Sequence, residues 1–398
     1  MKQIKWTSIF LLFIVFSLCN GHHTKASSDS TDPPEETQAV ETFNMKDIPL
    51  DDLKQFWDSV YDQYGGFLPE SQKGSFVDFI SGEKKFSFKE WLNGLLQFIF
   101  HEIIANGKLL GTLILLTVFS VFLQSLQSTF ERTSVSKVAN AIVFMVLMII
   151  ALNSFYVAVN YVKETIAAIT DFMIALIPLL LALIASSGGV LSSAFFHPVL
   201  LFLMNISGAL IEYVVLPLLF LSTLLSLVSM LSDHYKVTQL AGLLRNWSVG
   251  LLGIFMTVFL GVISVQGVST AVADGIGIRT AKFVTGNFIP VIGRMFTDAA
   301  DTVIGASLLL KNTVGIAGVV ILLIMTAFPA LKILLIAMVY KVAAAILQPL
   351  GAGSMIKCLD IISKNIIYVF AALAIVSLMF FLTVTVIVAA GNITMMVR

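Results

Sequence analysis

The sequence predicts an all-α, polytopic membrane protein with about eight transmembrane helices. Three observations carry this prediction: apolar runs recur along the chain, 58% of the residues are hydrophobic, and only 12% are charged. A typical soluble domain is about 25% charged, and a run of about 20 apolar residues matches the hydrocarbon core of a bilayer. The apolar runs are 109–126, 138–162, 166–185, 198–231, 247–267, 314–328, 333–350 and 366–390.

Residues 1–26 have the organisation of a signal peptide. Lys2 and Lys5 precede an apolar stretch that ends at Leu18, and Ala26 closes a small-residue cleavage site. An uncleaved anchor is the alternative. In both cases we expect the residues that follow to lie outside the cytoplasm.

An acidic linker and a small helical extracytoplasmic domain come next. Residues 27–48 are rich in Ser, Thr, Pro and acid, so they cannot bury a core and are expected to be disordered. Residues 49–104, called the head here, are expected to be helical, with Asp51 as the N-cap of a first helix and a capping box at Ser87 opening a second. The first helix carries an aromatic stripe that we predict binds partner proteins or the membrane body, formed by Phe56, Trp57, Tyr61 and Tyr64.

Residues 105–398 form the predicted membrane domain, and its hydropathy suggests an internal repeat. Sliding the chain on itself by about 117 residues superposes apolar runs, with 172–267 as one half and 284–384 as the other. Three spans in each half would require an inverted repeat, a plan found in transporters. A chance match of hydropathy is the alternative.

The segment from Gln266 to Lys311 is too polar and glycine-rich for a plain span. Arg294, Asp298 and Asp301 recur at i, i+4 and i+7, which places them on one helical face, and Arg279 precedes them. One interpretation is a re-entrant or interfacial segment that lines an aqueous path. The other is an amphipathic helix lying among the lipid headgroups.

A single carboxylate, Glu212, interrupts the run 198–231, with Asn205 two turns earlier on a similar face. A charge at bilayer depth is costly, so such a residue is a functional candidate. The alternative is that the run breaks there into two helices and Glu212 caps the turn. Together with the charged segment this predicts a pore or translocation path formed by Glu212, Arg279, Arg294, Asp298 and Asp301. The paired glycines Gly250/Gly253 and Gly315/Gly318 predict close helix packing.

Signals of catalysis are missing from the sequence. His101-Glu102 lacks the second histidine of the zinc-protease pattern, and the phosphate-binding loop of nucleotide hydrolases does not occur. We therefore expect no enzyme activity, no catalytic residues, no cofactor, no metal and no nucleic-acid partner.

Several long segments carry a resemblance to a known family. The most specific is Ala273-Asp-Gly-Ile-Gly-Ile-Arg-Thr-Ala-Lys282, and Gly293-Arg-Met-Phe-Thr-Asp-Ala-Ala-Asp301 continues it. With Ser232-Asp-His-Tyr-Lys236 and others, these segments resemble the stage III sporulation protein AE family of endospore formers. The resemblance covers nearly the whole chain.

The resemblance implies a multi-pass protein of the mother-cell membrane around the forespore, the outer forespore membrane. Such proteins belong to a channel or secretion-like complex that links mother cell and forespore and supports forespore development and late gene expression there. The partners implied are other membrane proteins of that complex, besides membrane lipid. The alternative function, favoured by the repeat and by Glu212, is a permease-like secondary transporter of a small solute.

Overall fold

The computed structural model describes residues 51–68, 88–129, 134–230, 237–288, 292–350 and 353–396, and over parts of them, including most of 267–303, only the backbone. The predicted signal peptide and linker lie outside these residues. All elements in the described ranges are helical, and they belong to one compact unit, Ile48–Arg398. The predicted boundary between head and membrane domain at residue 105 coincides with the last residue of the helix Phe88–Ala105, and the helices on both sides of it share this unit.

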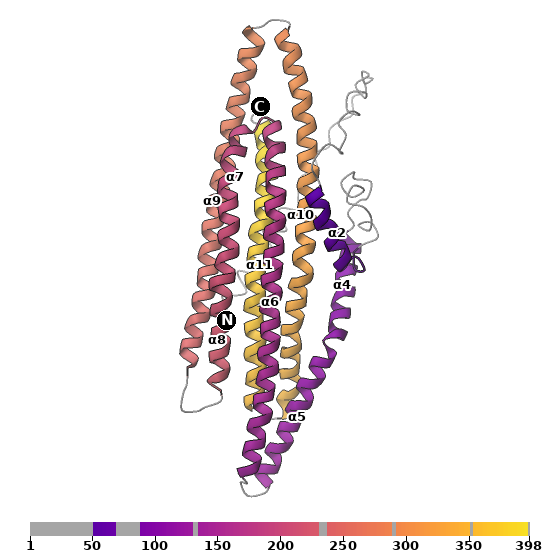
Figure 1. Cartoon of the computed structure of the whole chain (residues 1–398), viewed down its shortest axis with the longest axis vertical. Coiled ribbons are helices and arrows are strands. Elements are labelled where there is room, and N and C mark those ends of the chain that lie inside the picture. Colours follow the sequence, from indigo (N-terminus) through magenta and orange to yellow (C-terminus); the bar gives the residue numbers. More distant parts are fainter. Residues whose placement is uncertain are drawn as a thin grey trace. The chain divides into compact units, whose positions relative to one another are not determined.

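The helices pack as a bundle of long rods (Figure 1). The two predicted head helices, α2 and α4, both contact α10, and α2 also contacts α6. The elements in order are α2 (Asp51–Tyr64), α4 (Phe88–Ala105), α5 (Gly107–Thr129), α6 (Ser134–Ser186), α7 (Val190–Leu210), the π-helix η3 (Ile211–Val215), α8 (Leu216–Val228), α9 (Thr238–Phe288), α10 (Ile292–Leu347), the 3₁₀ turn η4 (Gln348–Leu350) and α11 (Gly353–Met396).

The expected eight spans are not confirmed in number. Five helices in the described residues are long and apolar enough to cross a membrane, or six if the bent pair α4–α5 counts as one. The difference arises because neighbouring apolar runs are joined without a turn. Lys163-Glu164-Thr165 continues α6 between two runs, and Pro329 lies inside α10 between two others. A charge or a single proline weakens a helix without ending it when packing holds the two sides in line.

The inverted repeat is also not confirmed. The half 172–267 begins inside α6 and includes α7, η3, α8 and part of α9, whereas 284–384 includes α10 and part of α11. The first half therefore holds parts of three passes and the second mainly two. The hydropathy match came from apolar runs that the fold distributes unequally over its helices.

A tight turn joins α6 to α7. Gly188 has a φ of 95°, a left-handed conformation that glycine adopts without strain. The Gly189 N–H donates to the Ile184 carbonyl and the Gly188 N–H to the Ala185 carbonyl, the hydrogen bonds of a Schellman motif. A Cβ on Gly189 would lie 2.5 Å from Ile184 Cγ2, so both glycines are needed for this turn.

The two glycine pairs have different surroundings. A Cβ added at Gly315 would lie 2.4 Å from Val388 Cγ2, and one at Gly318 would lie 2.6 Å from Leu176 Cδ2. This pair lets α10 approach α11 and α6 closely, as predicted. Gly250 and Gly253 have no heavy atom of another residue within 4 Å of the added Cβ, so they serve no close packing within the described chain. For that pair the packing prediction is wrong, because it lies on the open side of α9.

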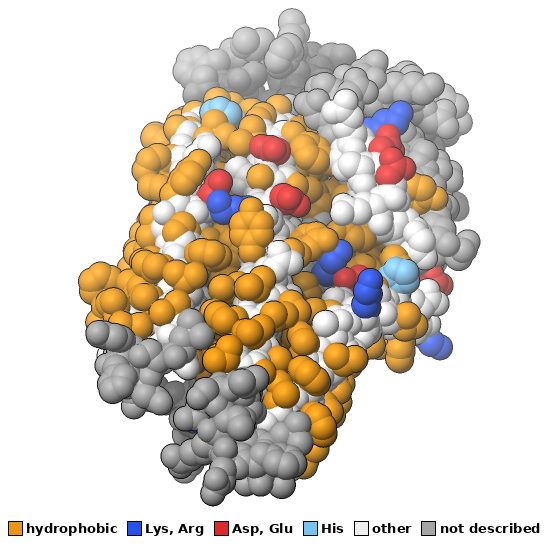
Figure 2. All heavy atoms as spheres, turned by 60° about the horizontal axis from the view of Figure 1, so that its bottom comes forward, with side chains coloured by type: hydrophobic (Ala, Val, Ile, Leu, Met, Phe, Trp, Pro, Cys, Tyr) orange, Lys and Arg blue, Asp and Glu red, His pale blue; other side chains and the backbone are white. Residues whose placement is uncertain are grey.

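Fully buried side chains show where the core lies. Phe155 and Phe172 of α6, Phe328 and Tyr340 of α10 and Phe380 of α11 are each less than 2% exposed. The outer surface is apolar as well: hydrophobic side chains cover most of the described surface in Figure 2, and charged groups form a few small patches. An apolar exterior is typical of a bundle that lies in lipid or against other membrane proteins.

Candidate functional site

Glu212 lies in one turn of π-helix within a single long helical pass. The element η3 (Ile211–Val215) follows α7 and continues directly into α8, so the run does not break into two helices at Glu212. The Leu216 N–H donates to the Ile211 carbonyl, five residues back. Pro217 follows at the start of α8, where it has no N–H to donate and crowds the preceding turn. A wider π-turn relieves this crowding, and such turns are frequent at functional sites.

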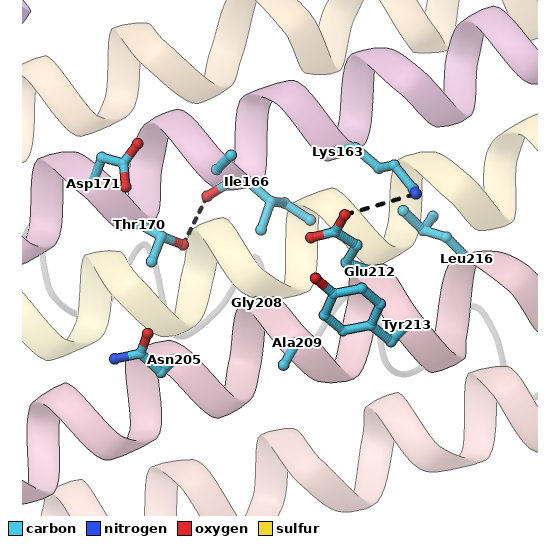
Figure 3. A pocket seen from close by; sticks show the side chains of 11 residues that line it. Lys163, Ile166, Thr170, Asp171, Asn205, Gly208, Ala209, Glu212, Tyr213 and Leu216 are labelled. Carbon is cyan, nitrogen blue, oxygen red and sulfur yellow. Dashed lines mark hydrogen bonds and ion pairs between the residues drawn. The ribbon is translucent and has the colours of Figure 1, made fainter.

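A pocket of about 280 Å³ opens beside this π-turn, between α6 and the α7–η3–α8 pass (Figure 3). Its lining combines charged, polar and apolar side chains. From α6 come Lys163, Ile166, Ala167, Thr170 and Asp171, and from the other pass come Asn205, Gly208, Ala209, Glu212, Tyr213 and Leu216. Glu212 is therefore a pocket residue rather than a helix cap.

Both signs of charge occur in the pocket. Lys163 Nζ lies 3.8 Å from Glu212 Oε1, and their side chains are 39% and 44% exposed. A direct hydrogen bond between such groups is about 2.7–2.9 Å long, so this pair is an ion pair without a direct hydrogen bond. Asp171 lies toward the other end of the pocket in Figure 3.

The uncharged polar residues of the pocket are held by their own helices. The Thr170 hydroxyl donates to the Ile166 carbonyl at 2.7 Å, and the Asn205 amide nitrogen donates to the Leu201 carbonyl at 2.8 Å. The Asn205 amide oxygen and the Thr170 oxygen lone pairs are then the groups that face a ligand as acceptors. Lys163 is the one described cation among the lining residues, against two carboxylates.

A second polar cluster links α4 and α10 to α6, which also lines the pocket. Lys332 of α10 lies 3.8 Å from Glu102 of α4, and its ammonium group lies 4.4 Å from the centre of the Tyr161 ring on α6. Asn106 donates to Glu102 at 3.2 Å. Tyr161 lies half a turn before Lys163 on the same helix, so this cluster and the pocket are at one level of α6. We call Glu102, Tyr161, Lys163, Glu212 and Lys332 the polar belt.

The head helix α2 packs against the bundle through most of the predicted aromatic stripe. Phe56 meets Phe172 edge to face at 5.4 Å, and Tyr64 stacks on Phe328 at 4.5 Å. Trp57 is 1% exposed, whereas Tyr61 is 38% exposed. Trp57 is thus buried, Phe56 and Tyr64 are partly covered by the rings that they contact, and Tyr61 remains on the surface. Burial raises the pKa of the Tyr64 hydroxyl to about 12, with Tyr161 and Glu102 adding to the effect.

Much of the charged segment 266–311 is regular helix. α9 continues to Phe288 and α10 begins at Ile292, so the backbone is helical at Arg279, Arg294, Asp298 and Asp301. The side chains of these four residues lie outside the described part of the structure. Their proposed role in an aqueous path therefore stays a prediction.

Asp274, in the same segment, has a structural role. Its Oδ1 accepts from the Leu191 N–H and its Oδ2 from the Ser192 N–H, both at 3.0 Å. The carboxylate of α9 thus caps the N-terminus of α7, where a negative charge is favourable. It is 3% exposed.

Sequence reasoning missed Lys163. It lies in the gap between two apolar runs, and a lysine inside a long apolar segment is a candidate by the same cost argument that selects Glu212. The signal was present at Lys163-Glu164. Its partner, 49 residues along the chain, was beyond what spacing on one helix reveals.

Comparisons with known proteins place the chain in a family. The sequence profile described as "Stage III sporulation protein AE" matches residues 71–391. The chain is 59% identical over 399 residues to "Stage III sporulation protein AE" of Bacillus subtilis (strain 168), and the match covers 100% of both proteins. No solved structure matches. The chain therefore belongs to the stage III sporulation protein AE family.

Proposed function

We propose that this protein is an integral membrane component of a channel or secretion-like complex that links mother cell and forespore during endospore formation. Its membrane is the mother-cell membrane around the forespore, with the head residues 49–104 on the intermembrane side. In this role it supports forespore development and late forespore gene expression. The observation that carries the proposal is membership of the sporulation family over the full chain, joined with a bundle of apolar, membrane-type helices.

The length of the apolar helices supports a role in an assembly. The apolar part of α6, Ala141–Ser186, has 46 residues, or about 70 Å at about 1.5 Å per residue. The hydrocarbon core of one bilayer is about 30 Å thick. A substantial part of this apolar surface therefore lies beyond the core, where other membrane proteins of the complex are the natural cover.

The outer helix α9 supports the same role. Only 22% of its span window is buried inside the chain, compared with 56% for α10. Side chains such as Trp247 and Ile254 are 65% and 66% exposed. α9 thus offers a broad apolar face to lipid or to a partner protein.

The proposal is tested in a spore-forming bacterium that lacks the native protein. The full chain, fused to a fluorescent protein, is expected to surround the engulfed forespore and to restore a late forespore reporter. Cross-linking before purification is expected to recover other membrane proteins of the sporulating cell. Uniform labelling of all membranes together with an unrestored reporter would contradict the proposal.

A permease-like transporter of a small solute is the second candidate, favoured by the pocket at Glu212. The two functions respond differently to substitution. Glu212→Gln is expected to leave assembly and localisation intact if the protein is a scaffold or conduit subunit, and to abolish solute uptake if it is a permease. Tyr61→Ser, on the exposed side of α2, is expected to weaken partner recovery only in the first case.

A further inference from the structure

Three charged side chains form a triad on the surface where α10 and α11 lie side by side (Figure 1). The Asp360 carboxylate of α11 accepts from the Lys341 ammonium group of α10, and Lys364 Nζ of α11 lies 2.6 Å from Asp360 Oδ2. The two lysine side chains are 59% and 58% exposed. Because two ammonium groups share one carboxylate, this charged triad has an excess of one positive charge, and each ammonium group keeps N–H donors for another acceptor.

The head helix indicates which part of α6 lies in the bilayer. α2 packs on Phe172 through Phe56. On its outer side, Asp58 and Asp62 are exposed. Exposed carboxylates belong in water, so the part of α6 beside α2 lies outside the hydrocarbon core. The stretch Ala141–Val162, on the other side of the polar belt, is about 30 Å long and matches one hydrocarbon core.

The charged triad lies at the depth of this membrane stretch. The Tyr340 hydroxyl donates to Ser154 Oγ at 2.7 Å, so the next residue, Lys341, is level with Ser154 on α6. At about 1.5 Å per residue, Ser154 lies about 20 Å from Ala141 and about 12 Å from Val162. The triad is therefore inside the hydrocarbon core and not at its edge.

Exposed side chains at this level are apolar on three helices. Ile149 of α6, Met338 of α10 and Ile367 of α11 are 64%, 54% and 44% exposed. Lipid tails cover such side chains but offer no hydrogen-bond acceptor to a lysine. Charged side chains at this depth almost always face other protein or a water-filled cavity. The triad therefore indicates a contact with a group outside the chain.

The excess of positive charge continues from the triad onto α9. Lys357 is exposed one turn before Asp360. Tyr368 follows Lys364 by one turn, and the Arg245 guanidinium of α9 lies 5.4 Å from the centre of its ring. Arg245 Nε is buried and has no hydrogen-bond partner within the described chain. Four cations thus accompany one carboxylate on this face, which favours a ligand with a negative charge.

We propose that this face of α10 and α11 binds a transmembrane helix of a partner protein that carries an Asp or Glu at mid-bilayer depth. The partner's carboxylate accepts from the ammonium groups of Lys341 and Lys364, and the contact then holds two cations and two anions. Met338 and Ile367 pack against the apolar side chains of the partner helix. This inference rests on the proposed function in one respect, that the partner is another membrane protein of the complex.

Charge and depth argue against two other occupants of this face. A second copy of this chain, docked face to face, would bring four lysines to two aspartates, so like charges would repel. An anionic lipid headgroup would have to sink about 12 Å into the hydrocarbon to reach the triad. A carboxylate on a spanning helix reaches this depth without moving a headgroup out of water.

The test uses the purified full chain in lipid vesicles at pH 8, with a synthetic transmembrane peptide as the probe. The peptide is a Leu–Ala helix with one central Glu and a photoreactive residue beside it, and its control has Gln in place of Glu. The Glu peptide is expected to be cross-linked about tenfold more than the Gln peptide, because it gains a charge-assisted hydrogen bond. Mass spectrometry is expected to place the cross-link on α10 or α11.

Variants of the chain decide whether the triad causes this preference. Lys364→Met removes the excess charge and leaves the Lys341–Asp360 pair, so the preference for the Glu peptide is expected to disappear. Lys108→Met, at an exposed lysine of α5, is the matched control and is expected to keep it. Asp360→Asn keeps both lysines and is expected to strengthen the preference, which keeps the test decisive if Lys364→Met fails to fold. Equal capture of both peptides by the unaltered chain, or an unchanged preference in Lys364→Met and in Asp360→Asn, overturns the proposal.

A water-filled path is the competing explanation for charge at this depth. In sporulating cells, the full chain with Met338→Cys, and with Cys19 and Cys358 replaced by Ala, is treated with a membrane-impermeant thiol reagent. Protection of the new cysteine is expected because the partner helix covers this face, and rapid labelling overturns the proposal. The peptide result is independent of localisation: a chain that captures the Glu peptide but does not surround the forespore keeps this inference and loses the proposed function.

Discussion

Two carboxylates in apolar helices, Asp274 and Glu212, show how differently one fold treats the same chemical group. Asp274 is 3% exposed and accepts hydrogen bonds from two backbone N–H groups of α7. Glu212 is 44% exposed at its side chain and has one lysine at 3.8 Å. The first carboxylate is saturated by its own chain, and the second is open to a ligand.

The comparison separates structural charges from available ones. Buried polar groups are normally hydrogen-bonded. When one partner is removed, the other stays buried without a hydrogen bond, and the free energy of unfolding falls. A half-exposed ion pair contributes little to stability because water and salt compete with it. Asp274 is therefore expected to matter for folding, and Glu212 for binding.

The largest expected effect belongs to Asp274→Ala. Two N–H groups at the start of α7 lose their acceptors in a buried place, so the free energy of unfolding falls by roughly 2–4 kcal/mol. Thermal unfolding of the purified chain measures the change. Asp274→Asn keeps one acceptor oxygen and is expected to lose less. Equal melting temperatures for wild type and Asp274→Ala would contradict the capping role.

The next largest change in stability is expected when Gly318, which is in a packed contact, is replaced, compared with Gly250, which has open space around it. Gly318→Ala places a methyl group 2.6 Å from Leu176 Cδ2, so the α6–α10 contact must shift, and overpacking of this kind costs about 1–3 kcal/mol. Gly250→Ala, with open space around it, is expected to stabilise its helix by up to about 1 kcal/mol. Unfolding of both variants in one detergent tests the difference. The same sign of change for both would contradict the packing assignment.

The contact between Tyr64 of α2 and the bundle is expected to make a smaller, pH-dependent contribution to the stability of α2 packing. Its pKa rises from the ordinary value of 10.0 to about 12 because the hydroxyl is buried, so the packed state holds the proton more tightly than the open state. This contribution is complete below pH 10 and is lost as the pH rises toward about 12.

Trp57, buried in the same helix, reports the loosening of α2. In a variant with Trp6, Trp91 and Trp247 replaced by Phe, its emission is expected to shift to longer wavelength between pH 10 and about 12. Tyr64→Phe keeps the stacked ring and removes the hydroxyl, so the shift is expected to shrink. An unchanged shift in that variant would assign the transition to another group.

The smallest effect on stability is expected for Glu212→Gln. The Lys163 pair is partly exposed, so its loss changes the free energy of unfolding by no more than about 0.5 kcal/mol. A large loss of stability in Glu212→Gln would make its carboxylate a structural group like Asp274.

Many local features of the fold could be predicted from sequence. The helix start at Asp51 is confirmed, as are the second helix after Ser87 and the packing role of Gly315/Gly318. These features depend on caps, periodicity and residue size within one element. The span count and the inverted repeat, which are not confirmed, and the packing role of Gly250/Gly253, which the described chain does not show, depend on how elements meet.

The sequence predicts one charged residue of the candidate site but not the residues that accompany it. Glu212 stands out because a lone charge in an apolar run is costly. Lys163 and Asp171 become its companions only when α6 lies beside the α7–η3–α8 pass. The π-turn that shapes this side of the pocket follows from one proline and its packed neighbours, and hydropathy carries no signal of it.

The sequence by itself determined the class of the protein. Long apolar helices lie in a membrane or against other apolar surfaces, because their apolar area is unfavourable in water and a helix satisfies its own backbone hydrogen bonds. The tertiary structure decided which charges are satisfied and which remain open. Asp274 meets Leu191 and Ser192 from more than 80 residues away, whereas Glu212 meets a pocket. Such contacts depend on the register and spacing of packed helices, which the identity of a residue and its neighbours in sequence do not specify.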